Sequence, residues 1–306
     1  MKRLLPLLLS LVLLAGCASP APAPAKSKEF TDDEGNTVSV ASLERVAVLY
    51  GSFAEIWLSA GGTVGAVTTD AIAERALPLP ADTLSVGSVK EPDREALLAY
   101  DPTLVICSAD IAAQRPLADF LRSLGIPVAQ MRVDGFGDYL RFLRLCCDLT
   151  GRDDLYEENG AAVERRIHTL LDALPEGEGP GALLLRAYST GVRVKSDDNF
   201  VGQMLDELGV RDLSRDYPSL LEELSLEQLI LMDPDYLFVV VMGDEGAALR
   251  SLREGIGANE GFRTLSAVKN GHLIILPKEL FHYKPNARWA ESYEYLIHIL
   301  YPDLSL

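Results

Sequence analysis

Positively charged residues are scarce in this sequence of 306 residues: 28 lysines and arginines stand against 45 aspartates and glutamates, a formal net charge of −17. A protein that binds nucleic acid needs a basic surface to displace the counterions of the phosphates, and the sequence offers no such stripe. The same deficit disfavours broad electrostatic adsorption to anionic lipid. The composition therefore predicts no nucleic-acid partner and no charge-driven membrane contact.

Cysteine and histidine are equally sparse, with four of each. No Cys-x-x-Cys or His-x-x-x-His pair occurs, which disfavours a site where protein side chains alone hold zinc or manganese. Cys107, Cys146 and Cys147 lie in apolar segments, where we expect buried thiols that pack as small hydrophobic side chains. The sequence thus predicts no direct metal site.

Two enzyme motifs are also missing. Gly61-Gly62 follows a helical segment instead of opening one, so it does not form a phosphate-binding loop. The segment AYSTG at 187–191 approaches the Gly-x-Ser-x-Gly nucleophile motif, but it begins with alanine and leads into a short strand where a helix is required. A secreted hydrolase is therefore the least favoured alternative, and we expect no enzyme activity.

The start of the chain reads as a secretory signal. A short basic beginning leads into the apolar stretch Leu4–Leu14, which is too short to span a bilayer as a stable helix. The small residues that follow end at Cys17, which resembles the bacterial lipoprotein signal, in which the cysteine is lipidated and becomes the mature N-terminus. We expect a signal peptide over 1–16, lipidation at Cys17 and an extended Ala/Pro tether over 17–28. This predicts an extracytoplasmic protein attached to the cell membrane through its lipid anchor only.

One pattern occurs twice: residues 93–107 read DREALLAYDPTLVIC, and residues 225–239 read SLEQLILMDPDYLFV. Each copy opens with a good N-cap, Asp93 or Ser225, and has a glutamate two residues later. Each continues as a short apolar helix up to Asp-Pro, where proline prevents further helix. An apolar run typical of a strand covered on both faces follows. Copies this far apart are not solenoid repeats; they indicate two similar α/β lobes.

The rest of the chain has the same alternation of short apolar strands and helical segments, which is typical of mostly parallel sheets. Glu29–Val40 reads as a two-stranded ribbon, and Asp153–Leu174 reads as one long helix. We predict an α/β fold with an N-terminal lobe over 29–151, a connecting helix within 152–177, and a C-terminal lobe over 178–306. A ligand cleft should lie between the lobes.

Together, the lipidation signal, the two lobes, the connecting helix and the repeated pattern resemble one family, the solute-binding lipoproteins of ABC importers for iron–siderophore, haem and vitamin B12. The resemblance covers about residues 29–302 and includes SAGG at 59–62, LGIPV at 124–128 and NFVGQMLDELG at 199–209. It implies a class III periplasmic-binding-protein-like fold with two Rossmann-like lobes joined by one rigid helix. It also implies a monomer without a cofactor.

The resemblance assigns a role to the repeated glutamates. In this family a glutamate at the start of the repeat helix in each lobe docks onto arginines of the permease, and these positions are Glu95 and Glu227 here. The implied partners are the permease and its ATPase. The alternative is that each glutamate only stabilises its own helix dipole, by a few tenths to about 1 kcal/mol, which explains less well why both occupy matching positions.

Candidate ligand-binding residues follow the strands, because ligands of open α/β lobes bind beyond the carboxyl ends of the strands. Aromatic side chains offer broad apolar faces, and arginine pairs with carboxylate or phenolate oxygens of a chelate. Such residues are informative in an acidic protein. The predicted ligand-binding residues are Tyr50, Phe53, Lys90, Arg186, Tyr188, Met242, Phe281, Tyr283 and Lys284.

These residues, with the resemblance, favour an iron(III)–siderophore-type chelate carried as an intact complex. Haem is an alternative, with Tyr283 or His282 as an axial ligand. Cobalamin is another, although the loop Gly87–Lys90 lacks the aromatic that cobalamin-binding relatives commonly carry there. A sensor lipoprotein without a transport role on the same fold is the alternative from a different functional class.

Overall fold

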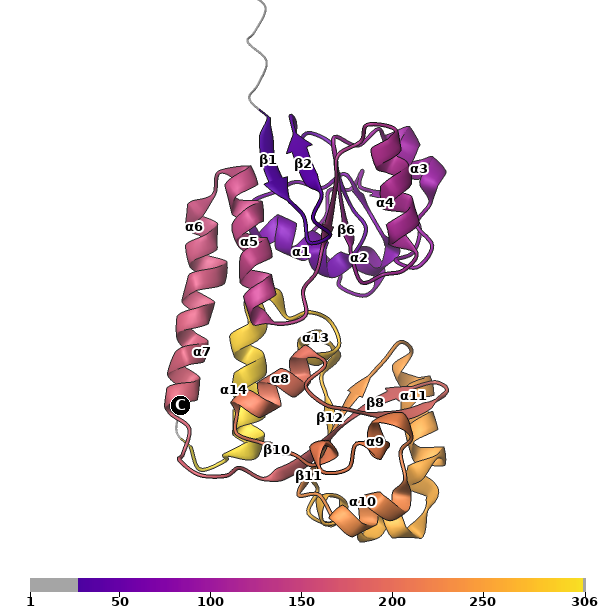
Figure 1. Ribbon diagram of the computed structural model, residues 1–306, viewed down its shortest axis with the longest axis vertical. Coiled ribbons are helices and arrows are strands. Elements are labelled where there is room, and N and C mark those ends of the chain that lie inside the picture. The colour runs from indigo at the N-terminus through magenta and orange to yellow at the C-terminus, as the bar shows by residue number, and fades with distance from the viewer. Residues whose placement is uncertain (1–26, 305–306) are drawn as a thin grey trace, which may run out of the picture.

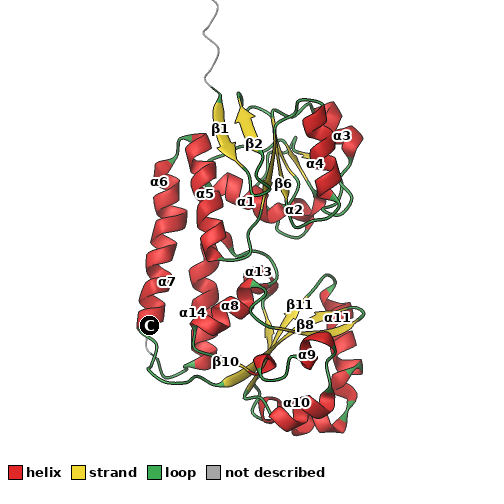
Figure 2. Ribbon diagram, viewed as in Figure 1, coloured by secondary structure: helices red, strands yellow, loops and turns green. Residues whose placement is uncertain are grey.

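The computed structural model describes residues 27–304. Two lobes are stacked along the long axis, and a long helical segment joins them along one side (Figure 1). Each lobe has a sheet with helices packed around it (Figure 2). The predicted signal peptide and Cys17 lie outside the described residues.

The N-terminal lobe has a five-stranded parallel sheet in the order β5-β4-β3-β6-β7. Its strands are β3 (Val46–Val48), β4 (Ala66–Val67), β5 (Leu84–Ser85), β6 (Leu104–Ser108) and β7 (Val128–Met131). Its helices are α1 (Gly51–Ser59), α2 (Thr69–Ala73), α3 (Arg94–Tyr100), α4 (Gln114–Ser123) and α5 (Phe136–Thr150). The predicted ribbon is confirmed as β1 (Lys28–Thr31) antiparallel to β2 (Thr37–Val40).

The C-terminal lobe has a parallel sheet in the order β10-β8-β11-β12, with β9 antiparallel to β8. Its strands are β8 (Gly181–Tyr188), β9 (Gly191–Lys195), β10 (Arg211–Asp212), β11 (Tyr236–Val241) and β12 (Leu273–Leu276). Its α-helices are α8 (Phe200–Glu207), α9 (Ser219–Glu222), α10 (Leu226–Met232), α11 (Glu245–Glu254), α12 (Ser266–Lys269), α13 (Lys278–Phe281) and α14 (Trp289–Leu300). Short 3-10 turns cover Leu213–Arg215, Ile256–Ala258, Glu260–Thr264 and Asn286–Arg288.

The repeated pattern forms α3 and α10, and its capping is confirmed. The side chains of Asp93 and Ser225 each accept a hydrogen bond from the backbone N–H three residues later, at 3.0 and 3.4 Å. Both helices end at the predicted Asp-Pro, where Asp101 and Asp233 adopt left-handed backbone angles (φ 54° and 44°). Aspartate tolerates this region better than most residues, and the following proline keeps it out of the right-handed helix.

The connecting segment is helical from Asp153 to Asp172, close to the predicted single helix. It consists of α6 (Asp153–Tyr156), a π-helical turn η1 (Glu157–Ala161) and α7 (Ala162–Asp172). A π turn adds a residue without breaking the helix, and it is the one departure from the expected regular α-helix. Arg166 ties α7 to α14 through two hydrogen bonds to Glu294, at 2.7 and 2.6 Å.

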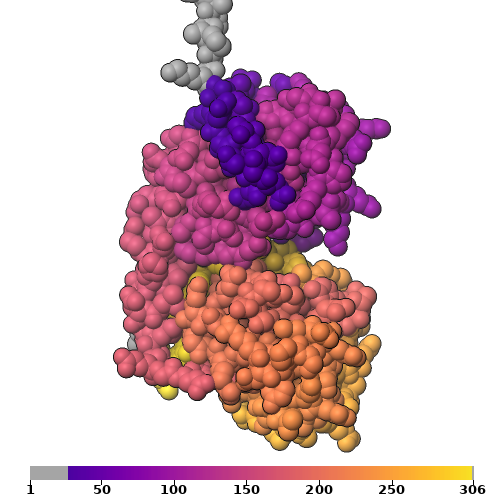
Figure 3. All heavy atoms as spheres, in the orientation of Figure 1, coloured from indigo at the N-terminus to yellow at the C-terminus, as the bar shows by residue number. Residues whose placement is uncertain are grey.

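The lobes also share apolar packing beside the connecting helix, and they meet along a seam in the space-filling view (Figure 3). Phe136 at the start of α5 lies edge-on to Trp289 at the start of α14, with ring centroids 5.7 Å apart. Phe200 of α8 contacts the same indole at 5.3 Å. Because one apolar core thus includes residues of both lobes, helix and core together restrain movement between the lobes.

Candidate ligand-binding cleft

The carboxyl ends of both sheets border two adjoining cavities between the lobes, with volumes of about 360 and 540 Å³. The two cavities share the side chains of Tyr50, Val89, Met242 and His282. Both lobes contribute walls, and we call the combined space the cleft. Its position is the one predicted from the strand ends.

All predicted ligand-binding residues but one line the cleft: Tyr50, Phe53, Lys90, Arg186, Tyr188, Met242, Tyr283 and Lys284. Tyr50 and Phe53 come from the β3–α1 junction and Arg186 from the end of β8. Within each lobe, the ends of parallel strands meet at one edge of the sheet, and the two edges border the same cleft. Their part in binding remains a prediction.

Phe281 is the exception, and its predicted place in the cleft is wrong. Its side chain is only 1% exposed and belongs to the apolar core, with its ring centroid 5.5 Å from that of Tyr295. Residues Lys278–Phe281 form the short helix α13 directly after the predicted strand. A single helical turn has little intrinsic stability, so only its packing reveals it.

Two half-buried cations in the cleft, Arg186 and Lys284, form no ion pair within residues 27–304. Lys90 forms none in this range either, but its side chain is exposed. Arg186 is half-buried, and its Nε is buried without a hydrogen-bond partner. Burial lowers the pKa of the Lys284 ammonium, which lies 5.2 Å from the centre of the Phe200 ring. Partly desolvated cations without a direct ion-pair partner are stabilised by an anion.

Three acidic residues around the cleft are already engaged, whereas Asp134 lines the same cavity as Lys284 and partly offsets the effect of burial on the pKa of that ammonium. Asp110 accepts a 2.6 Å hydrogen bond from Arg132, and Asp198 pairs with Lys195 at 2.5 Å. Asp70 accepts hydrogen bonds from the Gly51 N–H and the hydroxyl of its neighbour Thr68, at 2.7 and 2.6 Å. These carboxylates therefore do not form ion pairs with the two cleft cations.

Two phenols of the cleft, Tyr50 and Tyr283, are held in their protonated form. Burial raises the pKa of Tyr50. Burial, together with a hydrogen bond to Glu74, raises the pKa of Tyr283 to about 12. Both side chains are therefore neutral hydrogen-bond donors near neutral pH, and deprotonation to an iron-binding phenolate is disfavoured.

His282 has the opposite shift. Burial, with the positive charges of Lys278 and Arg186, lowers the pKa of His282 to about 4. Its Nδ1 lies 3.1 Å from the Met242 sulfur. A neutral imidazole therefore faces the cleft beside a thioether.

The helix α2 and the residues after it also contribute to the cleft, which the sequence pattern did not predict. Asp70, Glu74 and Arg75 all line the larger cavity. α2 has only five residues, too few for a periodic apolar pattern. The one available signal was chemical, because Arg75 is an arginine in a protein with few cations.

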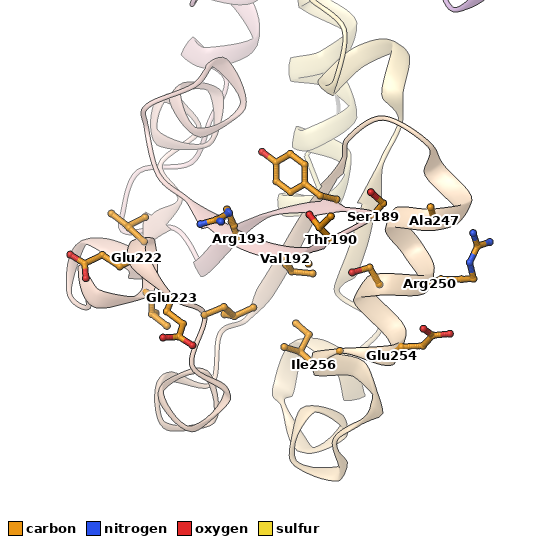
Figure 4. A pocket seen from close by; sticks show the side chains of 17 residues that line it. Ser189, Thr190, Val192, Arg193, Glu222, Glu223, Ala247, Arg250, Glu254 and Ile256 are labelled. Carbon is orange, nitrogen blue, oxygen red and sulfur yellow. The ribbon is translucent and has the colours of Figure 1, made fainter.

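A larger groove of about 830 Å³ lies on the C-terminal lobe alone, below the β8–β9 hairpin (Figure 4). Glu222 and Glu223 stand on one side of it, and Arg250 and Glu254 stand on the other. The segment Tyr188–Thr190 borders both this groove and the cleft. Because the N-terminal lobe contributes no lining residue, the groove does not have the two-lobe setting expected of the ligand site.

The described residues include three cysteines outside the cleft. Cys107, Cys146 and Cys147 are buried and unpaired, as predicted, and burial raises the pKa of each thiol. Within residues 27–304, no three His, Cys, Asp or Glu side chains are placed to hold a metal ion. In the same range, no helix is long and apolar enough to cross a membrane.

The repeated glutamates lie outside the cleft. Glu95 and Glu227 are exposed in the first turns of α3 and α10. Neither carboxylate forms an ion pair within the described part of the chain. In Figure 1, α3 and α10 lie away from the connecting helix, one on each lobe.

The sequence profile of a family described as periplasmic binding protein matches residues 46–280. This chain belongs to that family. As a periplasmic binding protein it acts outside the cytoplasm by binding a solute, and it is not an enzyme. The hydrolase alternative is thereby removed.

Relatives of this periplasmic binding protein have been described. The Fe(3+)-citrate-binding protein YfmC of Bacillus subtilis (strain 168) is 24% identical over 278 residues, covering 87% of this chain and 86% of that protein. Staphylococcus aureus SirA complexed with staphyloferrin B aligns with a TM-score of 0.65 at 18% identity, over 89% and 98% of the two chains. S. aureus IsdE complexed with heme aligns with a TM-score of 0.68 at 17% identity, over 84% and 98%. The two structures confirm the class III fold.

Proposed function

We propose that this periplasmic binding protein captures an intact, anionic iron(III) chelate in the cleft and delivers it to the permease of an ABC importer. The observation that carries the proposal is the pair Arg186 and Lys284, two half-buried cations that line one cavity of the cleft and form no ion pair within the described residues. Carboxylate or phenolate oxygens at the periphery of a ferric chelate would form ion pairs with both side chains. The printed ligands of YfmC and SirA, ferric citrate and staphyloferrin B, support this class of solute.

The architecture favours a large preformed ligand over a bare ion. A connecting helix and a shared apolar core restrain the lobes, so they are poorly suited to close around a small ion. A chelator that already satisfies the metal needs no cage of protein side chains. The cleft, with cavities of about 360 and 540 Å³, offers space of the size that small-molecule sites commonly have.

A binding screen by tryptophan fluorescence tests the proposal. Trp289 is 1% exposed and contacts Phe200, which lines the cleft, so a bound ligand should alter its emission. We expect saturable quenching by ferric citrate or another anionic ferric siderophore, and none by the iron-free chelators at the same concentration. Tight binding of cobalamin alone would contradict the proposal.

Haem is the second candidate, and one pair of residues favours it. The neutral His282 imidazole and the Met242 thioether face the same cavity, and histidine and methionine are both ligands of haem iron. IsdE, which has the same fold, was crystallised with heme. In the same screen, a sharpened Soret band with haemin that is lost in His282→Ala would favour haem over the chelate.

We also propose that Cys17 is lipidated, so that the protein is attached to the membrane only through this anchor. The support is the sequence signal and the Ala/Pro tether at 17–28. In cells fed radiolabelled palmitate, we expect labelled wild-type protein in the membrane fraction. Cys17→Ser should be unlabelled and either unprocessed or released, and a labelled, membrane-bound mutant would contradict the anchor.

A further inference from the structure

A buried asparagine joins the two lobes at the rim of the cleft. Asn286 of the C-terminal lobe donates hydrogen bonds from Nδ2 to the Ser52 carbonyl oxygen at 3.0 Å and to Glu55 Oε2 at 2.7 Å, both in α1 of the N-terminal lobe. The residue is fully buried and has a left-handed backbone (φ 55°). Asparagine is one of the few residues other than glycine that adopt this conformation readily.

Arg75, in the N-terminal lobe, also connects the two lobes. Its guanidinium donates to the Ser52 hydroxyl and to the Lys284 carbonyl oxygen, both at 3.2 Å. It also pairs with Glu55 and lies 5.3 Å from the centre of the Tyr283 ring. Only 8% of its side chain is exposed. We call Ser52, Glu55, Arg75, Lys284 and Asn286 the clasp.

The clasp is a buried polar network that spans both lobes, and two of its atoms remain unsatisfied. Arg75 Nε and Asn286 Oδ1 are buried without hydrogen-bond partners. Removing one member of such a network leaves its partner buried and unpaired, which is costly. The described lobe arrangement is therefore favoured over any arrangement that separates α1 from residues 284–286.

The clasp is also part of the ligand site. Arg75 and Tyr283 line the larger cavity of the cleft, and Lys284 lines the smaller one. A ligand that fits between the lobes as they stand leaves the clasp intact, whereas a bulkier ligand has to separate the lobes and break it. The same contacts therefore affect both lobe spacing and ligand size.

We infer that the clasp sets the width of the cleft, and that Arg75 and Asn286 determine which size of chelate the protein accepts. The size-selection part rests on the proposed function, because it concerns a chelate bound in the cleft. The lobe-spacing part concerns the unliganded protein alone.

Lobe spacing is measured without ligand, by double electron–electron resonance between spin labels at Ala99→Cys and Arg253→Cys. Both positions are exposed, one on each lobe. The labels are attached in a Cys17→Ser background. Cys107, Cys146 and Cys147 can be retained because they are buried. Asn286→Gly keeps the left-handed backbone, which glycine adopts readily, and removes both hydrogen bonds. We expect a broader and longer distance distribution than in the wild type.

Two further variants keep this result interpretable. Glu55→Gln retains a hydrogen-bond acceptor but loses the charge opposite Arg75, so the distance distribution should shift in the same direction by a smaller amount. This variant tests the inference if Asn286→Gly folds poorly. Arg288→Lys is the control, since Arg288 is exposed and pairs with Glu291 at 2.8 Å outside the clasp. Unchanged distance distributions in both clasp variants would overturn the inference.

Size selection is measured as a ratio of affinities for two anionic chelates, compact ferric citrate and bulky ferric enterobactin. Loss of two buried hydrogen bonds should shift this ratio towards the bulky chelate by roughly tenfold in Asn286→Gly, with no shift in Arg288→Lys. An altered distance with an unaltered ratio would remove the role in selectivity. If no variant binds any chelate, the proposed function fails, while the lobe distances still decide whether the clasp sets the spacing.

Discussion

Reversing the charge of both repeated glutamates, Glu95→Lys together with Glu227→Lys, should abolish ATP hydrolysis stimulated by the binding protein and uptake of the ligand, with ligand affinity near the wild-type value. Transport should be lost while ligand affinity is kept because of where the two glutamates lie. Both carboxylates are exposed in the first turns of α3 and α10, and neither lines the cleft. The experiment uses the purified importer in proteoliposomes, with ferric-chelate affinity measured separately by fluorescence.

A large loss of docking is expected because the charge of each glutamate is reversed; removing the charge alone should have a small effect. An exposed ion pair contributes about 0–1 kcal/mol, so Glu→Ala at either site should weaken docking only slightly. Lysine placed opposite a permease arginine costs several kcal/mol through repulsion of like charges. The double reversal should therefore be far more severe than the double alanine variant, and its effect should weaken at high salt.

The matched control for net charge is Glu158→Lys together with Glu176→Lys. These glutamates are exposed, one within and one just beyond the connecting helix. That helix lies on the side of the molecule away from α3 and α10 (Figure 1). This variant changes the net charge by the same amount and should keep stimulated ATP hydrolysis. A large loss of ligand affinity in the folded Glu95/Glu227 variant, or equal loss of ATP hydrolysis in the control, would contradict docking by the repeated glutamates.

Arg186→Ala and Lys284→Ala should each weaken binding of an anionic ferric chelate by roughly ten- to a hundredfold, because a hydrogen bond to a charged group is worth about 1.5–3 kcal/mol. Neither cation forms an ion pair with a protein carboxylate in the described range, so stability should change little. Titration of tryptophan fluorescence gives the affinities, and thermal unfolding gives the stability.

Lys269→Ala is the control, since Lys269 is exposed at the end of α12 and lines neither cavity. Wild-type affinity in Arg186→Ala and Lys284→Ala together would refute the assignment of these cations. An affinity loss confined to neutral ligands would refute it as well, because the argument depends on the charge of the chelate.

The pH dependence of binding is a second readout of Lys284. Burial lowers the pKa of the ammonium in the free protein, and a bound anion should raise it again. Affinity should therefore be full below the free-protein pKa and fall as pH rises through it, because binding then requires uptake of a proton. Lys284→Arg keeps its charge throughout this range and should lose the slope.

Several features of this protein were determined by short stretches of sequence. Asp93 and Ser225 cap their helices, and Asp-Pro stops them, because each signal acts through hydrogen bonds and steric limits within a few residues. The buried runs of β6 and β11 likewise identified strands covered on both faces. Once parallel strands were predicted, Tyr50 followed at the carboxyl edge of one sheet, and Arg186 and Met242 at the carboxyl edge of the other.

Other features were decided only by tertiary structure. Phe281 reads as a loop aromatic in sequence, and its burial depends on how α13 packs against Tyr295. The clasp joins Arg75 to Lys284 and Asn286 to Ser52, pairs that lie 209 and 234 residues apart in the chain. No periodicity or local motif encodes such pairs, because their geometry depends on how two independently patterned lobes come together. Sequence thus determined the elements and the site's edge, and packing between the lobes decided the cleft's width and the partners of its charges.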